Sequence, residues 1–159
     1  MGVNQDQKVR VRNRCAGVSV VEFALIVPVF LLLFFAVVDL GVMFWVNLTM
    51  QHAVREGARY AITGRKDLDP NPDEAARIRD AAVLEKIKKS SLGLYDKVVD
   101  DTEVTDADGN AVAGFGQPGE TIVINLNCSW PLLTPLIRPF FSEGTYHFTV
   151  STAMRNEMF

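Results

Sequence analysis

The amino-acid sequence predicts an α+β protein in which a long N-terminal membrane-spanning helix packs on a small antiparallel sheet, with a second helix. Three observations predict this fold. Residues 23–46 form an apolar run. Residues 47–63 can extend the same helix, because Gly57 is the only glycine or proline in them. Residues 121–130 and 146–154 alternate between apolar and polar side chains. An uninterrupted apolar run is typical of a membrane helix, whereas period-two alternation is typical of half-buried antiparallel strands.

The apolar run is long enough to cross a membrane. It holds 24 residues with a single charge, Asp39, and a helix of that length is ~36 Å long, against a hydrocarbon core of ~30 Å. A cleaved secretory signal is disfavoured, because its apolar core is usually ~7–15 residues and ends at a small-x-small site. The run excludes a fully soluble cytoplasmic enzyme and leaves 113 residues, 47–159, for a folded domain.

The charges on the two sides of the run predict its orientation. Residues 1–17 carry four basic residues and one acidic residue, a net of +3, whereas residues 40–159 carry 12 basic and 16 acidic residues, a net of −4. Lys and Arg gather on the cytoplasmic side of a span. We therefore expect a cytoplasmic basic leader peptide at 1–17, a transmembrane helix at 18–46 and an extracytoplasmic α+β domain at 47–159.

The two cysteines and the net charge limit the chemistry of the chain. Cys15 and Cys128 lie on opposite sides of the predicted span, so we expect no disulfide within the chain and interpret Cys128 as a small core residue. The net charge of −3 gives no reason to expect nucleic acid. The chain has two His and two Cys, and we find no nucleophile–base pair, phosphate loop or metal-ligand pattern, so we expect no enzyme and no cofactor.

A short motif precedes the apolar run: Gly17, four residues, then Glu22 and Phe23. A carboxylate beside a span requires a reason, since burying it unpaired costs ~2.5 kcal/mol or more at mid-bilayer. Cleavage between Gly17 and Val18 would supply one, because the new α-amino group of Val18 would share a helix face with Glu22. In an assembly, Glu22 could equally pair with the amine of a neighbouring subunit. The alternative is an uncleaved signal anchor in which the motif is incidental.

Asp39 is the second charge of the span, about two-thirds along the run. Two interpretations have equal weight: its side chain reaches the headgroup layer, or it contacts a partner subunit within the membrane.

The C-terminal domain offers further elements. We expect the first helix to continue to Gly64, kinked at Pro28, with Leu48, Ala58, Ala61 and Ile62 facing the domain. A second helix should begin with Asn71 as its N-cap and run to about Leu92. Strands are expected at 98–105, 121–130 and 146–154, and a hairpin turn, in preference to a calcium loop, at 106–110.

The segment 131–141 is apolar and contains three prolines, so it is neither a helix nor a central strand. We expect it to cap the sheet or to present apolar side chains to the membrane surface or to a partner. The candidate contact residues are Leu136, Ile137, Phe140 and Phe141.

The sequence resembles a known family through several of these motifs. The leader RNRCAG followed by VSVVEF resembles a type IV prepilin signal, and ALIVPVFLLLFFAVVDLG, QHAVREGARYAITG, SWPLLTPL and VSTAMRNE are similar to segments of TadE-like minor pilins of tight-adherence (Tad/Flp) pili. The likeness is close over residues 14–64 and loose over 121–157. One departure is Val18, where better-known type IV pilins often have Phe or Met.

The resemblance implies a type IV pilin-like fold and a minor pilin (pseudopilin), cleaved between Gly17 and Val18 by a prepilin peptidase and acting in pilus assembly, adherence or secretion. It implies as partners the prepilin peptidase, other major and minor pilins, the inner-membrane assembly platform and membrane lipid. The location implied is the bacterial inner membrane, with a periplasmic C-terminal domain. The alternatives are an uncleaved single-pass anchor whose domain scaffolds envelope proteins, and a ligand-binding or sensing module.

Overall fold

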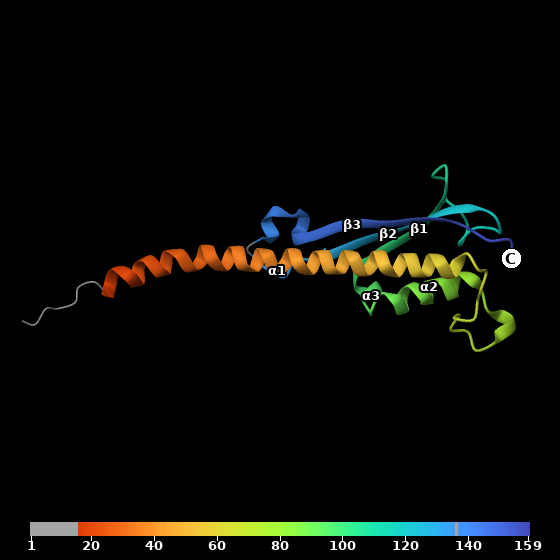
Figure 1. The fold of residues 1–159 in the computed structure, drawn as a ribbon, viewed down its shortest axis with the longest axis horizontal. Helices are drawn as coiled ribbons and strands as arrows, with labels where there is room; N and C mark the ends of the chain where they lie inside the picture. Colours follow the sequence, from red (N-terminus) through yellow and green to blue (C-terminus); the bar gives the residue numbers. More distant parts are fainter. Residues whose placement is uncertain (1–15, 136) are drawn as a thin grey trace, which may run out of the picture.

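The computed structural model of the chain describes residues 16–135 and 137–159. Its largest element is the helix α1, Ala16–Ala61, whose 46 residues run without interruption through Pro28. At ~1.5 Å per residue this helix is ~69 Å long. Its first half extends away from the rest of the chain, and its second half lies within the folded domain (Figure 1). The predicted long helix is therefore confirmed, although it ends at Ala61, three residues before Gly64.

A three-stranded antiparallel sheet forms the other main layer. Its strands are β1 (Val99–Asp106), β2 (Thr121–Pro131) and β3 (Thr145–Arg155), and their order in the sheet is β1-β2-β3. All three predicted strands are present. The alternation of β2 also has the predicted sense, since its apolar residues on one face are buried: Ile122, Ile124, Leu126 and Cys128.

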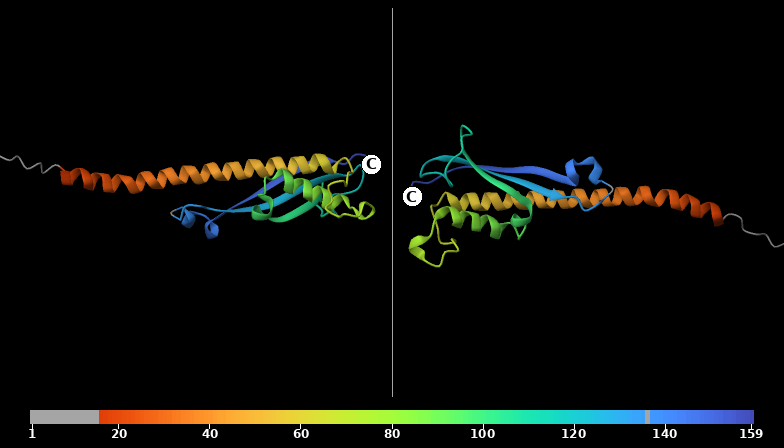
Figure 2. Two further views of the ribbon diagram at one scale, coloured as in Figure 1. Left: turned by 90° about the horizontal axis from the view of Figure 1, so that it is seen from below. Right: turned by 180° about the vertical axis from the view of Figure 1, so that it is seen from behind.

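The core lies where the second half of α1 meets the sheet and the shorter helix α2 (Arg79–Ser90) (Figure 2). On α1 the core residues recur every three or four positions: Val46, Met50, Ala53, Val54, Ala58 and Ala61. The predictions for Ala58 and Ala61 are confirmed, but Leu48 is 62% exposed. Leu48 follows Val46 by two residues, which corresponds to a rotation of about 200° on a helix of 3.6 residues per turn, so its side chain points away from the core.

The second helix begins later than predicted. Residues Glu74–Ala76 form a separate 3₁₀ turn, η1, with Asp73 as its N-cap, and α2 starts only at Arg79. Asn71 is not a helix cap here, because its side-chain oxygen accepts the N–H of Asp73 at 3.1 Å. After α2, a short helix not foreseen from the sequence, α3 (Tyr95–Val98), leads into β1.

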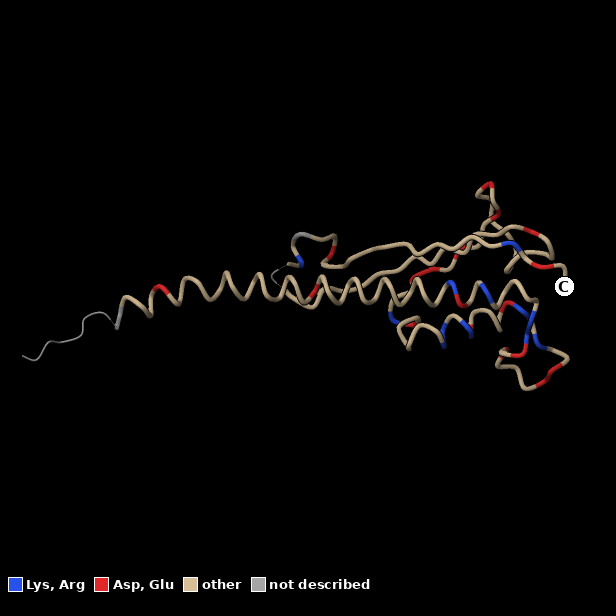
Figure 3. Tube along the Cα trace, viewed as in Figure 1, with Lys and Arg blue, Asp and Glu red and all other residues tan. Residues whose placement is uncertain are grey.

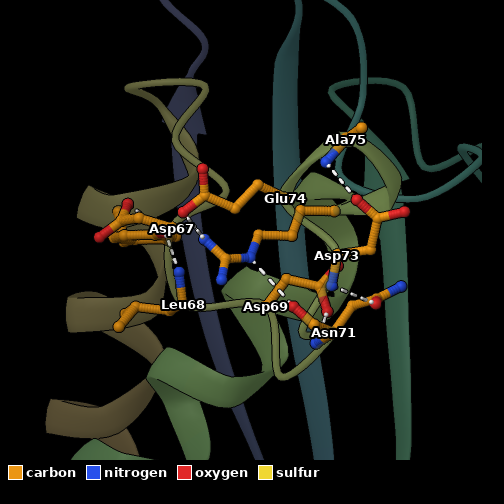
Figure 4. Close-up of polar contacts among 9 residues, drawn as sticks. Asp67, Leu68, Asp69, Asn71, Asp73, Glu74 and Ala75 are labelled. Atoms are coloured by element: carbon orange, nitrogen blue, oxygen red, sulfur yellow. Dashed lines mark hydrogen bonds and ion pairs between the residues drawn. The ribbon is translucent and has the colours of Figure 1, made fainter.

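The connection between α1 and α2 is held by a series of short-range carboxylate contacts (Figure 4). Asp69 is buried, and its carboxylate accepts the N–H of Asn71 at 2.9 Å and that of Ile78, immediately before α2, at 2.6 Å. These two backbone donors lower the pKa of Asp69. Asp69 therefore fixes the backbone immediately before α2, through a contact between residues nine positions apart, and the predicted Asn71 cap is absent.

The predicted turn at 106–110 is confirmed. The Asp106 carboxylate accepts the backbone N–H groups of Asp108 and Asn110 at 2.9 and 2.8 Å, and Gly109 has a positive φ of 87°. The hydrogen bonds from Asn110 lower the pKa of Asp106. Its oxygens thus serve to close the turn.

Candidate functional site

The first half of α1 exposes its apolar side chains on all sides. Over the described part of the chain, α1 from Val18 onward is the one helix that is long and apolar enough to cross a membrane. Charged positions gather around the second half of α1 and the domain, whereas the first half is almost free of them (Figure 3). This arrangement fits a single-pass membrane protein.

The Gly17–Glu22 motif lies at the beginning of this helix. Gly17 is the second residue of α1, so the Gly17–Val18 bond lies in its first turn. Val18, Glu22 and Phe23 are all exposed. Because residues four apart lie one above the other on a helix, Val18 and Glu22 share one face. Among the described residues, the Glu22 carboxylate has no hydrogen bond or ion pair, so its charge is free to contact a group outside this chain.

The Asp39 carboxylate contacts the backbone of its own chain, which is neither of the two interpretations that the sequence left open. Its side chain is 2% exposed, and each carboxylate oxygen accepts one backbone N–H from the segment after β2. Oδ1 accepts from Leu133 at 3.2 Å, and Oδ2 accepts from Thr134 at 3.0 Å. The carboxylate is thus held within its own chain, on groups that lie 94 and 95 positions further along the sequence.

The segment that reaches Asp39 is the β2–β3 loop, residues 132–144. Leu132 and Thr134 are buried, whereas Leu133 between them is 58% exposed. The loop is folded on itself: Leu132 donates its N–H to the Gly144 carbonyl at 3.1 Å, and Arg138 Nε donates to the Leu132 carbonyl at 3.1 Å. Two 3₁₀ turns follow, η2 (Arg138–Phe140) and η3 (Ser142–Gly144).

The four apolar residues predicted for this loop have different outcomes. Ile137 and Phe141 are half-buried. Leu136 and the side chain of Phe140 lie outside the described residues. Leu133, which was not among the four predicted residues, is the exposed apolar residue of the loop whose own N–H contacts Asp39. The sequence offers no local signal for Leu133, because its contact with Asp39 is made by the backbone.

The helix that carries Glu22 and Asp39 matches a known protein family over most of its length. Residues 17–59 match the family model of TadE-like proteins. The matched range begins at Gly17 and ends two residues before α1 does. No curated protein and no solved structure matches the chain. Residues 60–159 lie outside the matched range.

Two further polar side chains have structural roles. Glu56 of α1 lies 3.5 Å from Arg59 and 3.7 Å from Lys86 of α2, so its carboxylate pairs with cations and joins two helices. Within the described residues, no group of three or more potential metal ligands includes Glu56 or the exposed His52. Cys128 lies in the buried core, as predicted, and burial together with nearby Asp100 raises the pKa of its thiol to about 12. Cys15 lies outside the described residues.

Proposed function

We propose that this chain is a TadE-like minor pilin of a tight-adherence pilus system. The observation that carries the proposal is the exposed Glu22 carboxylate, one helical turn from Val18, at the beginning of a helix whose family match also begins at Gly17. Hydrolysis of the Gly17–Val18 peptide bond by a prepilin peptidase would leave an α-amino group on Val18. That group is a cation in the membrane-proximal turn, and a carboxylate is its natural partner.

We propose that Glu22 pairs with this amine, in the same chain or in a neighbouring pilin. Glu22 lies 25 residues before Asn47, or ~38 Å along the helix, so its charge is remote from the folded domain. The exposed apolar side chains of the first half of α1 then serve two purposes. They contact lipid while the subunit stays in the membrane, and they pack against the helices of other pilins during assembly.

The role that we propose for the chain is therefore in pilus assembly and not in catalysis. Its proposed partners are the prepilin peptidase, other major and minor pilins and the inner-membrane assembly platform. The leader charge of +3 supports a cytoplasmic N-terminus and a C-terminal domain on the opposite side of the membrane. We propose that this membrane is a bacterial inner membrane and that the domain is periplasmic, as the match to TadE-like proteins suggests.

The N-terminal residue of protein recovered from membranes tests this proposal. In cells with the peptidase we expect mass spectrometry to detect a mature chain that begins at Val18. Gly17→Leu should block processing, because a side chain at the scissile position has to fit the protease site. Gly41→Leu is the matched control on the same helix: no atom lies within 4 Å of a Cβ built at Gly41, so processing should continue. An intact leader in the native protein would contradict the proposal and favour the uncleaved anchor.

Co-purification with other pilins tests the role of Glu22. Glu22→Gln removes the charge and keeps the shape, so we expect less pilin partner in the purified complex while leader cleavage continues. Glu103→Gln, an exposed carboxylate on β1, is the control and should leave the yield of partner unchanged. Equal recovery with Glu22→Gln and Glu103→Gln would remove the support for a Glu22–amine pair.

A further inference from the structure

We propose that the β2–β3 loop is immersed in the membrane leaflet that faces the C-terminal domain, with lipid as the occupant of its apolar surface. The proposal requires that α1 crosses a bilayer. It is independent of leader cleavage and of assembly into a pilus.

The first argument is the depth at which Asp39 holds the loop. The exposed apolar surface of α1 continues beyond Asp39 through Leu40, Phe44 and Trp45. From Phe23 to Trp45 the helix measures ~35 Å, which a hydrocarbon core of ~30 Å accommodates with a modest tilt. Trp is enriched at the membrane–water boundary. With Trp45 at that boundary, Asp39 lies six residues, or ~9 Å, deeper along the helix axis.

The second argument is the hydrogen bonding of the loop backbone. Irregular backbone is tolerated at membrane depth only where the protein satisfies its polar groups. Asp39 accepts two of the loop's N–H groups, and carbonyls within the loop accept four others, those of Leu132, Ile137, Phe141 and Gly144. Two further positions of the loop, Pro135 and Pro139, have no N–H to satisfy. Six N–H groups of the loop thus have acceptors within the chain, so part of the loop backbone needs no water.

The third argument is the character of the side chains around the Asp39 contact. Leu133 is largely exposed beside the apolar face of α1. A groove of about 410 Å³ adjoins the beginning of β3, with a mostly apolar lining of Leu40, Met43, Phe44, Asn47, Leu48, Gln51 and Tyr146. Arg138 and Glu143 are exposed as well, and both charges must stay among headgroups. Arg138 suits lipid phosphate, which guanidinium binds well. This limits immersion to the ~5–10 Å typical of interfacial segments.

Depth measurement with a spin label tests the proposal in the full chain. The chain carries Cys15→Ser and Leu133→Cys, is labelled at the new thiol, and is reconstituted in vesicles of phosphatidylethanolamine and phosphatidylglycerol. Buried Cys128, with its raised pKa, stays unlabelled. Power saturation with oxygen and with a water-soluble nickel chelate then gives the depth. We expect the Leu133 label to lie ~5–10 Å below the lipid phosphates. The control is Asp108→Cys, an exposed position in the turn after β1, whose label should be in water.

Two results would overturn the proposal. One is nickel access at Leu133 equal to that at Asp108, which would place the loop in water. The other is a Leu133 label shielded from both oxygen and nickel, which would indicate contact with a second protein chain. Asp39→Asn supplies an independent check, because it weakens the contact that fixes the loop depth. It should shift the label toward the nickel reagent, and an unchanged depth would show that Asp39 does not hold the loop in the leaflet.

Discussion

Replacement of Asp39 by alanine leaves the N–H groups of Leu133 and Thr134 without the acceptors that they have in the native chain. Each hydrogen bond to a charged group contributes about 1.5–3 kcal/mol net, so the loss of two lowers the free energy of loop opening by about 3–6 kcal/mol. Since 1.4 kcal/mol corresponds to a factor of ten, we expect amide exchange at these two positions to accelerate by about 100-fold or more.

Hydrogen exchange of the full chain in detergent micelles measures this effect residue by residue. Asp39→Asn keeps one carbonyl oxygen as an acceptor, so its exchange rates at Leu133 and Thr134 should lie between those of the native chain and Asp39→Ala. Glu22→Gln is the control, because it neutralises the other carboxylate of the membrane helix and should leave both amides as slow as in the native chain. Native exchange rates in Asp39→Ala would refute the reasoning, since the carboxylate would then contribute nothing to loop stability.

Three further predictions concern the C-terminal domain. Gly57→Ala should lower the free energy of unfolding by about 1–3 kcal/mol, because a Cβ at this buried glycine would overlap an isoleucine of α2. Thermal unfolding measures this change. Gly41→Ala is the control, because its new methyl group meets no other atom and alanine favours the helix more than glycine does. A chain that starts at Arg65 should be unfolded by circular dichroism, whereas one that starts at Asn47 should unfold cooperatively, because only the second retains the helix that covers the sheet. The domain should also lose stability as the pH rises from about 8.5 toward about 12, because the Cys128 thiol ionises near the lower value when unfolded but near the higher one when folded. The unfolding midpoint measured against pH tests this loss of stability. Cys128→Ala is the control, because it has no thiol to ionise.

Each of these three predictions has an outcome that contradicts it. Equal unfolding temperatures for Gly57→Ala and Gly41→Ala would show that α1 and α2 separate at no cost. Similar melting curves for the two shortened chains would show that the sheet finds another cover. A thiol at position 128 that reacts at pH 8.5 as fast in the folded protein as in urea would show that burial does not protect it.

The sequence predicted those features whose signal is local. The alternation at 121–130 identified the buried face of β2, because side chains on a strand change face at every residue. Leu48 was placed wrongly because it follows directly after the apolar membrane run, where an apolar side chain does not by itself show which side of the helix faces the core. The Asn71 cap was wrong for a similar reason, since an Asx turn and a helix cap use the same residue types.

The candidate site likewise has one part that a local signal predicts and one part that it does not. Gly17 and Glu22 could be found from their spacing, and the family match begins at the first of them. The partner of Asp39 could not be found in this way. Its contacts are two backbone N–H groups far along the chain, and a backbone donor has no signature in the residue type that carries it. The alternatives weighed from sequence, headgroups and a partner subunit, omitted the chain's own loop.

The sequence separation between Asp39 and the loop that donates hydrogen bonds to it has a consequence for biosynthesis. Asp39 leaves the ribosome 95 residues before Thr134, and synthesis proceeds at ~5–20 residues per second. The carboxylate therefore waits between about 5 and 19 s for the N–H groups that it binds in the finished protein. During that interval the membrane helix carries an unpaired charge, which favours a shallower position near the headgroups. Synthesis of the first residues after β2 would then let the helix reach its final depth, so that insertion of this protein ends only after β2 has been made.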